Sequence, residues 1–119
     1  MATLNAHTFA TRDDAEAHYL GLIDEAAAKA RRIDPAQAEL YREKATQANA
    51  GGGPLLDAEA AALGAAPDTI REAVLSNHEH WQRRTQQIEL ARLQAKAAVR
   101  NAANAAAMHR IYREYQEAL

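Results

Sequence analysis

The stretch that decides the fold is Ile70–Leu119, IREAVLSNHEHWQRRTQQIELARLQAKAAVRNAANAAAMHRIYREYQEAL. It holds no Gly and no Pro, so the sequence allows one helix roughly 70 Å long. Apolar or small side chains return every seven residues at Val74, Trp81, Ile88, Ala95 and Ala102. The positions three residues later are Asn77, Arg84, Ala91, Ala98 and Ala105. This period predicts a coiled-coil-like seam that another helix must cover.

The patch Asn101–Asn104 leaves two courses open for this helix, because Asn is a poor residue in a helix interior. The helix either runs on to the C-terminus or breaks there and folds the following segment back onto the core. That segment carries an apolar stripe made of Met108, Ile111, Tyr112, Tyr115 and Leu119. For an unbroken helix no earlier segment is long enough to cover both seam and stripe. We therefore predict that these five residues bind a partner protein or a second copy of the chain.

The remainder of the chain also has a helical pattern, with clear starting residues. Residues 1–10 show no period and are expected to be a flexible N-terminal arm. Thr11 and Asp34-Pro35 are typical helix starts, the second with Pro at the first helical position. Because one Gly-rich linker at 49–54 is too short to separate domains, residues 11–119 are predicted to form a single helical domain with a hinge there.

Two further boundaries complete the predicted layout. A short helix is expected over Leu55–Leu63, ended by Gly64, and the long helix should open near Pro67. No segment alternates apolar and polar residues over a useful length, so no strand is expected. The fold class is therefore all-α, a small bundle or hairpin of helices with one long C-terminal helix.

The packing of this bundle is expected to centre on Trp81. We predict that Val74, Trp81 and Ile88 are covered by residues from the two N-terminal helices. The covering residues are Tyr19, Leu22, Ile23, Ala26, Tyr41 and Ala45. Hydrophobic residues make up 48% of the chain but aromatic ones only 5%, and Ala supplies much of the rest, so the core should be thin. A thin core favours completion by a partner.

The sequence offers little that could carry chemistry. His78 and His80 are two residues apart and would point to different sides of a helix, unlike the four-residue spacing of zinc-binding helices. The one Ser, Ser76, lies within the long helix, and Gly51–Gly53 is followed by Pro54 and not by a phosphate-binding helix start. The chain has no Cys. We expect no enzyme activity, no metal and no cofactor.

The uneven distribution of charge suggests a second possible function, nucleic-acid binding. The net charge is −2, but bases dominate between Arg83 and Arg113. The segment Leu55–Leu75 has helix-turn-helix proportions, which would suit a small nucleic-acid-binding regulator. Against this, a recognition helix presents its N-terminal turns to DNA, and here those turns carry Asp68 and Glu72. A small helix-turn-helix-like nucleic-acid-binding regulator is therefore the alternative hypothesis.

Several segments resemble small Ala-rich proteins encoded among phage tail genes, including tail-fibre assembly proteins described as chaperones. The first group of segments is Leu40-Tyr41-Arg42-Glu43-Lys44, Gln47-Ala48, Pro54-Leu55-Leu56, Glu59-Ala60 and Gly64. The second group is Trp81, Ile88-Glu89, Ala91-Arg92 and the run Ala95–Val99. The resemblance as a whole covers roughly residues 14–103.

This resemblance implies a non-enzymatic tail assembly factor or minor tail component that acts by protein–protein binding. Its partner would be another phage tail or tail-fibre protein, and a homo-oligomer is the second expectation. It supplies no catalytic residues. Residues 1–10 lack the basic start and apolar core that are typical of a signal peptide, and no apolar run is long enough for a bilayer, so we expect no membrane partner. The expected location is the host cytoplasm or the virion.

Overall fold

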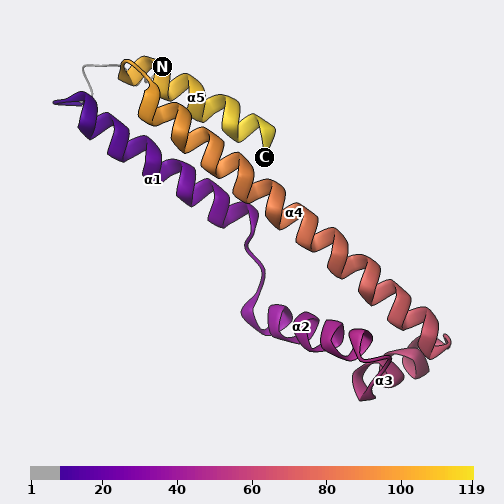
Figure 1. The fold of residues 1–119 in the computed structure, drawn as a ribbon. Coiled ribbons are helices and arrows are strands. Elements are labelled where there is room, and N and C mark those ends of the chain that lie inside the picture. Colours follow the sequence, from indigo (N-terminus) through magenta and orange to yellow (C-terminus); the bar gives the residue numbers. More distant parts are fainter. Residues whose placement is uncertain (1–8) are drawn as a thin grey trace. The chain divides into compact units, whose positions relative to one another are not determined.

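The computed structural model describes residues 9–119, and these form five helices and no strand. The helices, labelled in Figure 1, are α1 (Arg12–Ala30), α2 (Pro35–Asn49), α3 (Pro54–Leu63), α4 (Pro67–Asn101) and α5 (Ala105–Ala118). The all-α class is confirmed. Most of the expected N-terminal arm, residues 1–8, lies outside the described residues. None of the helices in the described part is long and apolar enough to cross a membrane.

Local capping explains where three of the helices begin. The Thr11 hydroxyl accepts a hydrogen bond from the Asp14 N–H at 3.0 Å, and the Asp34 carboxylate accepts one from Gln37 N–H at 3.1 Å. Both starts are as predicted. The Asn104 side chain likewise accepts from Ala107 N–H at 2.9 Å and begins α5. Of the two courses left open for the long helix, the structure therefore has the break after Asn101.

Glycines with positive φ end two of the helices. Gly51 (φ 99°) and Gly52 (φ 143°) turn the chain from α2 toward α3, and Gly64 (φ 65°) ends α3 in the left-handed conformation. Residues with a Cβ adopt these angles at a cost, so Gly is suited to all three positions. The predicted linker at 49–54 is thus a turn between two neighbouring helices.

The described residues divide into two compact units. The terminal unit contains the residues up to Arg32 together with Thr85–Leu119, and the middle unit is Ile33–Arg84. The organisation as one domain over residues 11–119 stays a prediction. The Gly-rich turn lies inside the middle unit, and the boundaries between the units fall elsewhere in the chain.

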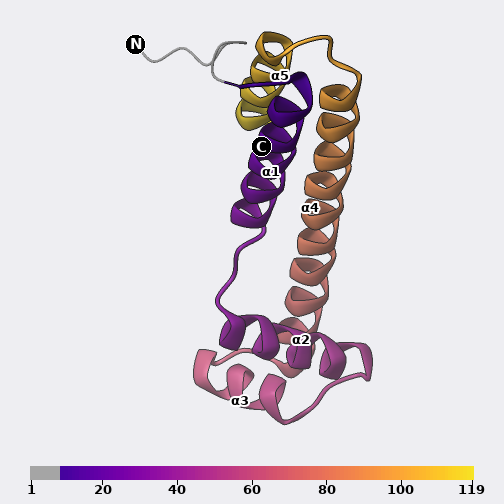
Figure 2. The same cartoon turned by 90° about the vertical axis from the view of Figure 1, so that its left-hand side faces the viewer.

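The terminal unit is built from α1, α5 and the last part of α4, which lie next to one another in Figure 2. α1 carries Tyr19 and Ile23 into a shared core with residues of the other two helices. The buried members are Ala15, Tyr19, Ile23, Ala95, Val99, Ala105, Met108 and Tyr115. Phe9, from the end of the predicted arm, is partly buried against them. Three of the four tyrosines pack on this core.

The middle unit has a much smaller core. Its buried cluster is Ala48, Leu56, Ala60 and Ile70, with Val74 and Leu75 partly buried against it. Two of the four are alanines, and burial stabilises in proportion to the apolar area removed from water, at about 25 cal/mol per Å². The middle unit therefore draws less stabilisation from its core than the terminal unit does.

The buried face of α4 follows only half of the predicted heptad seam. Ile88 and Ala95 are buried as expected. At the end of the helix the second line lies four residues after the first, although Ala91, on the predicted line, is partly buried against the same core. Val99 is fully buried, whereas Ala98, on the predicted line, is exposed. A seven-residue period is compatible with a second line either three or four residues after the first. The three-residue line was already the less favourable one, because it contains the polar residues Asn77 and Arg84, both of which are exposed.

Candidate protein-binding groove

Trp81 is not a core anchor, contrary to the sequence-based prediction. Its side chain is 49% exposed, and Tyr41, which was expected to cover it, is also 49% exposed. Four of the other expected covering residues pack instead in the terminal unit, Tyr19 and Ile23 as buried core residues and Leu22 and Ala26 partly buried against them. The physical reason is size: α2 buries only Ala45 and Ala48, and such small side chains cannot enclose an indole.

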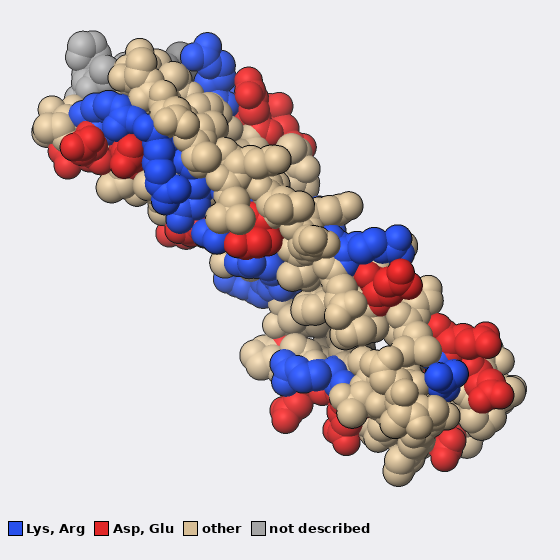
Figure 3. All heavy atoms as spheres, in the orientation of Figure 1, with Lys and Arg blue, Asp and Glu red and all other residues tan. Residues whose placement is uncertain are grey.

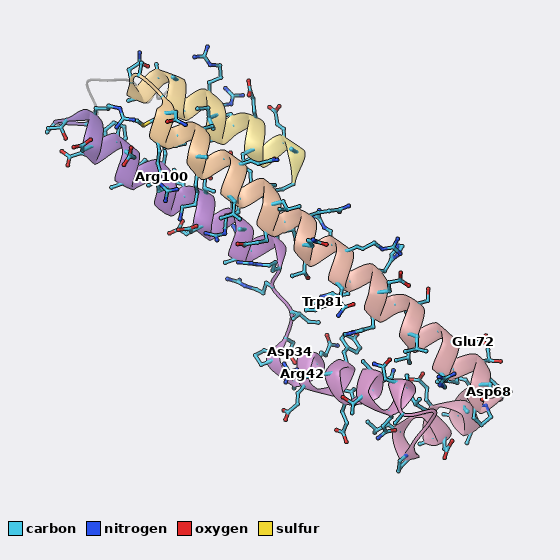
Figure 4. All side chains as sticks on the ribbon, in the orientation of Figure 1. Asp34, Arg42, Asp68, Glu72, Trp81 and Arg100 are labelled. Carbon is cyan, nitrogen blue, oxygen red and sulfur yellow. The ribbon has the colours of Figure 1, made fainter. Side chains whose placement is uncertain are left out.

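A groove of about 390 Å³ lies between α2 and the first half of α4 in the middle unit. Trp81 and Tyr41 both line it, and Ala38 and Val74 supply the rest of its apolar wall. The polar lining consists of Arg42, Lys44, Asn77 and His78. Figure 4 shows Trp81 on α4 and Arg42 on α2. A concave apolar surface with a few polar groups is the usual form of a binding site.

The charged residues that line the groove are both basic. Lys44 is 17% exposed and its ammonium contacts the Glu59 carboxylate at 2.6 Å, so its charge is balanced within the unit. Arg42 is exposed, and no ion pair in residues 9–119 involves it. The groove therefore presents one unbalanced cation beside two half-exposed aromatic rings.

The C-terminal stripe, predicted to be a docking surface, is largely part of the terminal unit's core. Met108 is fully buried and Tyr115 is 6% exposed, so neither is available to a partner in this fold. Ile111, Tyr112 and Leu119 are partly buried against the same core. The prediction rested on an unbroken helix. Because the chain turns at Asn104, α5 packs on α1 and the protein covers its own stripe.

Tyr112, one of the five residues of the C-terminal stripe, is partly exposed and lines a groove on the surface. This second groove, of about 350 Å³, is also lined by residues of α1 and by Gln116. The charged lining of this groove has both signs, Glu25 on one hand and Lys29 and Arg32 on the other. A surface with mixed charge and one aromatic ring gives little indication of a particular ligand.

An ion-pair cluster joins α1 to α4 within the terminal unit. The Asp24 carboxylate accepts hydrogen bonds from Arg92 at 2.9 Å and from Lys96 at 3.0 Å. Arg92 also donates twice to Glu89, which in turn contacts Arg31 at 3.4 Å. The intermixed basic and acidic side chains on the visible face of this unit are seen in Figure 3. Asp24, from the N-terminal part of the chain, thus pairs here with two basic residues of its C-terminal part, Arg92 and Lys96.

Titration of these groups is shifted in the direction that favours their charged forms. The hydrogen bond from Lys96, aided by Arg92, lowers the pKa of Asp24. The hydrogen bond from Arg92 lowers the pKa of Glu89. The pKa of Arg92 is raised by Glu89 and then Asp24. Each group is stabilised by its neighbours, which is typical of a structural network and does not require a catalytic role.

An aromatic cluster fills the end of the terminal unit. The Tyr19 hydroxyl lies 3.1 Å from His109 Nδ1, and the Tyr19 ring contacts the rings of Phe9 and Tyr112. Burial raises the pKa of Tyr19. His18 packs against Phe9 with ring centroids 5.2 Å apart. These contacts are those of a packed core.

Two other features of the sequence, the candidate metal ligands and the helix-turn-helix-like segment, can be located in the structure. Among the described residues, no group of three His, Cys, Asp or Glu side chains is placed to hold a metal ion. In the helix-turn-helix reading, the first turns of α4 would face DNA, and Asp68 and Glu72 are exposed there (Figure 4). Arg71 donates to the Ala48 carbonyl at 2.7 Å, so its cation is engaged within the unit. On this surface, carboxylates would lie next to the DNA phosphates, and the two groups would repel each other.

Comparison with known proteins adds no relative: the chain matches no protein-family model, and no curated protein or solved structure is detectably similar to it.

The groove was not predicted from the sequence because Trp81 was expected to be a buried core residue. One available indication was composition: the segments on either side of Trp81 are polar, with Glu79-His80 before it and Gln82-Arg83 after it. The sequence also did not indicate that Val99 is a core residue, or that Arg12 donates hydrogen bonds to the Ala102 and Arg100 carbonyls at the end of α4. Arg12 lies at the start of α1, where a base is not favoured by the helix dipole, and so its role depends on a tertiary contact.

Proposed function

We propose that this chain is a non-enzymatic protein-binding factor, and specifically a phage tail assembly factor or minor tail component. The observation that carries the binding function is the pair of half-exposed aromatic residues, Tyr41 and Trp81, at one groove. Large aromatic side chains on a concave surface are typical anchors of protein–protein interfaces. The phage tail context rests on the sequence resemblance around Leu40–Lys44 and Ala95–Val99.

The distribution of large apolar residues supports this proposal. Both units leave leucines exposed, including Leu90 and Leu93 in the terminal unit, but only the middle unit leaves its aromatic residues, Tyr41 and Trp81, half-exposed. The middle unit also has the smaller core. A partner that covers the groove would add apolar burial where the chain has least of its own. The proposed partner is a tail or tail-fibre protein, met in the host cytoplasm or on the virion.

Co-expression with the tail and tail-fibre proteins of the phage that encodes the chain tests this function. We expect one of them to co-purify with the chain in a defined stoichiometry, and its yield of assembled product to fall when the chain is omitted. The variant carrying Tyr41→Ala and Trp81→Ala should lose the complex. Leu93→Ala removes a similarly exposed side chain from the terminal unit and should retain it.

Two results would overturn the proposal. One is normal assembly of every tail protein without the chain, with no complex on size exclusion. The other is tight, sequence-selective DNA binding that weakens steeply between low and moderate salt, because such behaviour is typical of a phosphate-binding regulator.

A further inference from the structure

We infer that the groove between α2 and α4 receives an acidic segment of the partner protein, with an aromatic or leucine side chain held between Tyr41 and Trp81. This inference rests on the proposed protein-binding function and specifies the chemistry of its partner. It is carried by the groove's charge, which is opposite in sign to that of the unit around it. The groove has an apolar wall and an unbalanced guanidinium. The proposed segment has an apolar side chain for the first and a carboxylate for the second.

The charge of the groove contrasts with that of the middle unit. Acidic residues outnumber basic ones by eight to five in residues 33–84. The lining nevertheless contains Arg42 and Lys44 and no Asp or Glu. Lys44 is neutralised by Glu59, which leaves the Arg42 guanidinium to determine the local field. A carboxylate entering the groove would therefore meet a cation there and be repelled by the acidic surface around it, which favours one defined position.

The residue types at the groove match such a segment. A guanidinium binds a carboxylate through two parallel N–H···O hydrogen bonds, which fixes direction as well as charge. Tyr41 and Trp81 offer flat apolar faces for a large side chain, with Val74 and Ala38 beside them. Asn77 adds an amide that both donates and accepts hydrogen bonds, as a peptide backbone requires.

Other occupants fit these charges less well. Nucleic acid presents a row of phosphates, and one unbalanced cation in a net acidic unit offers little to bind them. A symmetric dimer with groove facing groove would bring Arg42 close to its own copy. An acidic apolar segment is the occupant that matches both the Arg42 guanidinium and the two aromatic side chains.

Trp81 is the only Trp in the chain, so its fluorescence reports directly on this groove. The full chain would be titrated with three blocked synthetic peptides of equal length. The first has leucine, phenylalanine and one glutamate in an otherwise uncharged sequence, the second replaces the glutamate by lysine, and the third replaces the two apolar residues by alanines. We expect a saturable change with the first peptide and affinity at least about tenfold weaker for the other two.

Charge-reversal variants supply the matched control. Arg42→Glu should weaken binding of the acidic peptide by roughly tenfold and improve binding of the lysine peptide. Arg113→Glu makes the same change of charge at an exposed position on α5 and should leave both affinities within about twofold. Circular dichroism and the melting temperature of each variant would establish that the fold is retained.

The outcomes separate this inference from the function on which it rests. Equal binding of acidic and lysine peptides, or equal effects of the two variants, would overturn the acidic preference. Absence of peptide binding while a tail protein still forms a complex that needs Tyr41 and Trp81 would also overturn it, with the proposed function intact. A dimer in solution whose dissociation exposes Trp81 would instead identify a second copy as the occupant.

Discussion

Arg12, in the first turn of α1, donates a hydrogen bond from its Nε to the carbonyl oxygen of Ala102 at 2.9 Å, just beyond the end of α4. Its Nη2 donates to the Arg100 carbonyl at 2.8 Å. The last carbonyls of a helix have no partner within the helix, and a cation there also complements the helix dipole. One guanidinium thus ties the first turn of α1 to the end of α4, where the chain turns into α5.

Replacing Arg12 by Ala should therefore destabilise the terminal unit. Hydrogen bonds to a charged group contribute about 1.5–3 kcal/mol, and since the Arg12 side chain is 35% exposed we expect about 1–2 kcal/mol. Urea unfolding followed by circular dichroism would measure it. Arg12→Lys should restore only part of the loss because an ammonium lacks the guanidinium fork. Arg113→Ala, at an exposed position on α5, is the control. Equal free energies of unfolding for the two variants would show that the hydrogen bonds of Arg12 do not stabilise the unit.

Asp24 should make stability depend on acid pH. Its pKa is lowered in the folded chain by Lys96 and Arg92, so the unfolded chain, with an ordinary pKa of about 3.9, takes up the proton first. The stabilisation is then present above about pH 4 and lost as pH falls through the folded pKa. Asp24→Asn should cost about 1 kcal/mol at neutral pH. Chemical unfolding at several pH values should show the gap between variant and parent closing in acid; a constant gap would contradict this.

Met108 should behave as a core residue and not as an interface residue. It is fully buried in the terminal unit, so Met108→Ala should cost about 2–5 kcal/mol. Deleting Arg110–Leu119 should lower the melting temperature strongly, because it removes Tyr115 from the same core. Differential scanning calorimetry would measure both. Unchanged melting with loss of an oligomer would instead restore the docking role first predicted for the stripe.

Trp81→Ala should leave stability almost unchanged. The side chain is half-exposed, and substitutions at such positions alter the free energy of unfolding by about 0.5–1 kcal/mol at most. Ile23→Ala, at a fully buried position, should cost about 2–5 kcal/mol and serves as the comparison. Equal losses for the two variants in urea unfolding would mean that Trp81 belongs to a core.

Gly64→Ala should destabilise the turn between α3 and α4. Gly64 has φ 65°, and a residue with a Cβ adopts this left-handed conformation at a cost of about 1 kcal/mol. No atom within 4 Å would meet the new Cβ, so the backbone angle alone should set the loss. Gly21→Ala, inside α1 with equally open surroundings, should be neutral or stabilising in the same unfolding assay.

The helix boundaries could be read from the sequence because the interactions that set them are local. Thr11 and Asp34 bond to backbone N–H groups three residues away, and Gly64 ends α3 through its own backbone angle. The Asn101–Asn104 patch likewise marked the break, although its sequence left a continuous helix open as the alternative. The all-α class followed from the same local information.

Which residues are buried was decided by tertiary structure. Along α4 the seven-residue period permits a second line at either of two spacings, and only the side chains of α1 and α5 select the one through Val99. Trp81 is exposed because α2 presents alanines, which lack the volume to enclose it, and Met108 is buried because α5 turns back onto α1. Capping depends on residues within one turn, whereas burial depends on the volume that distant helices bring to the contact.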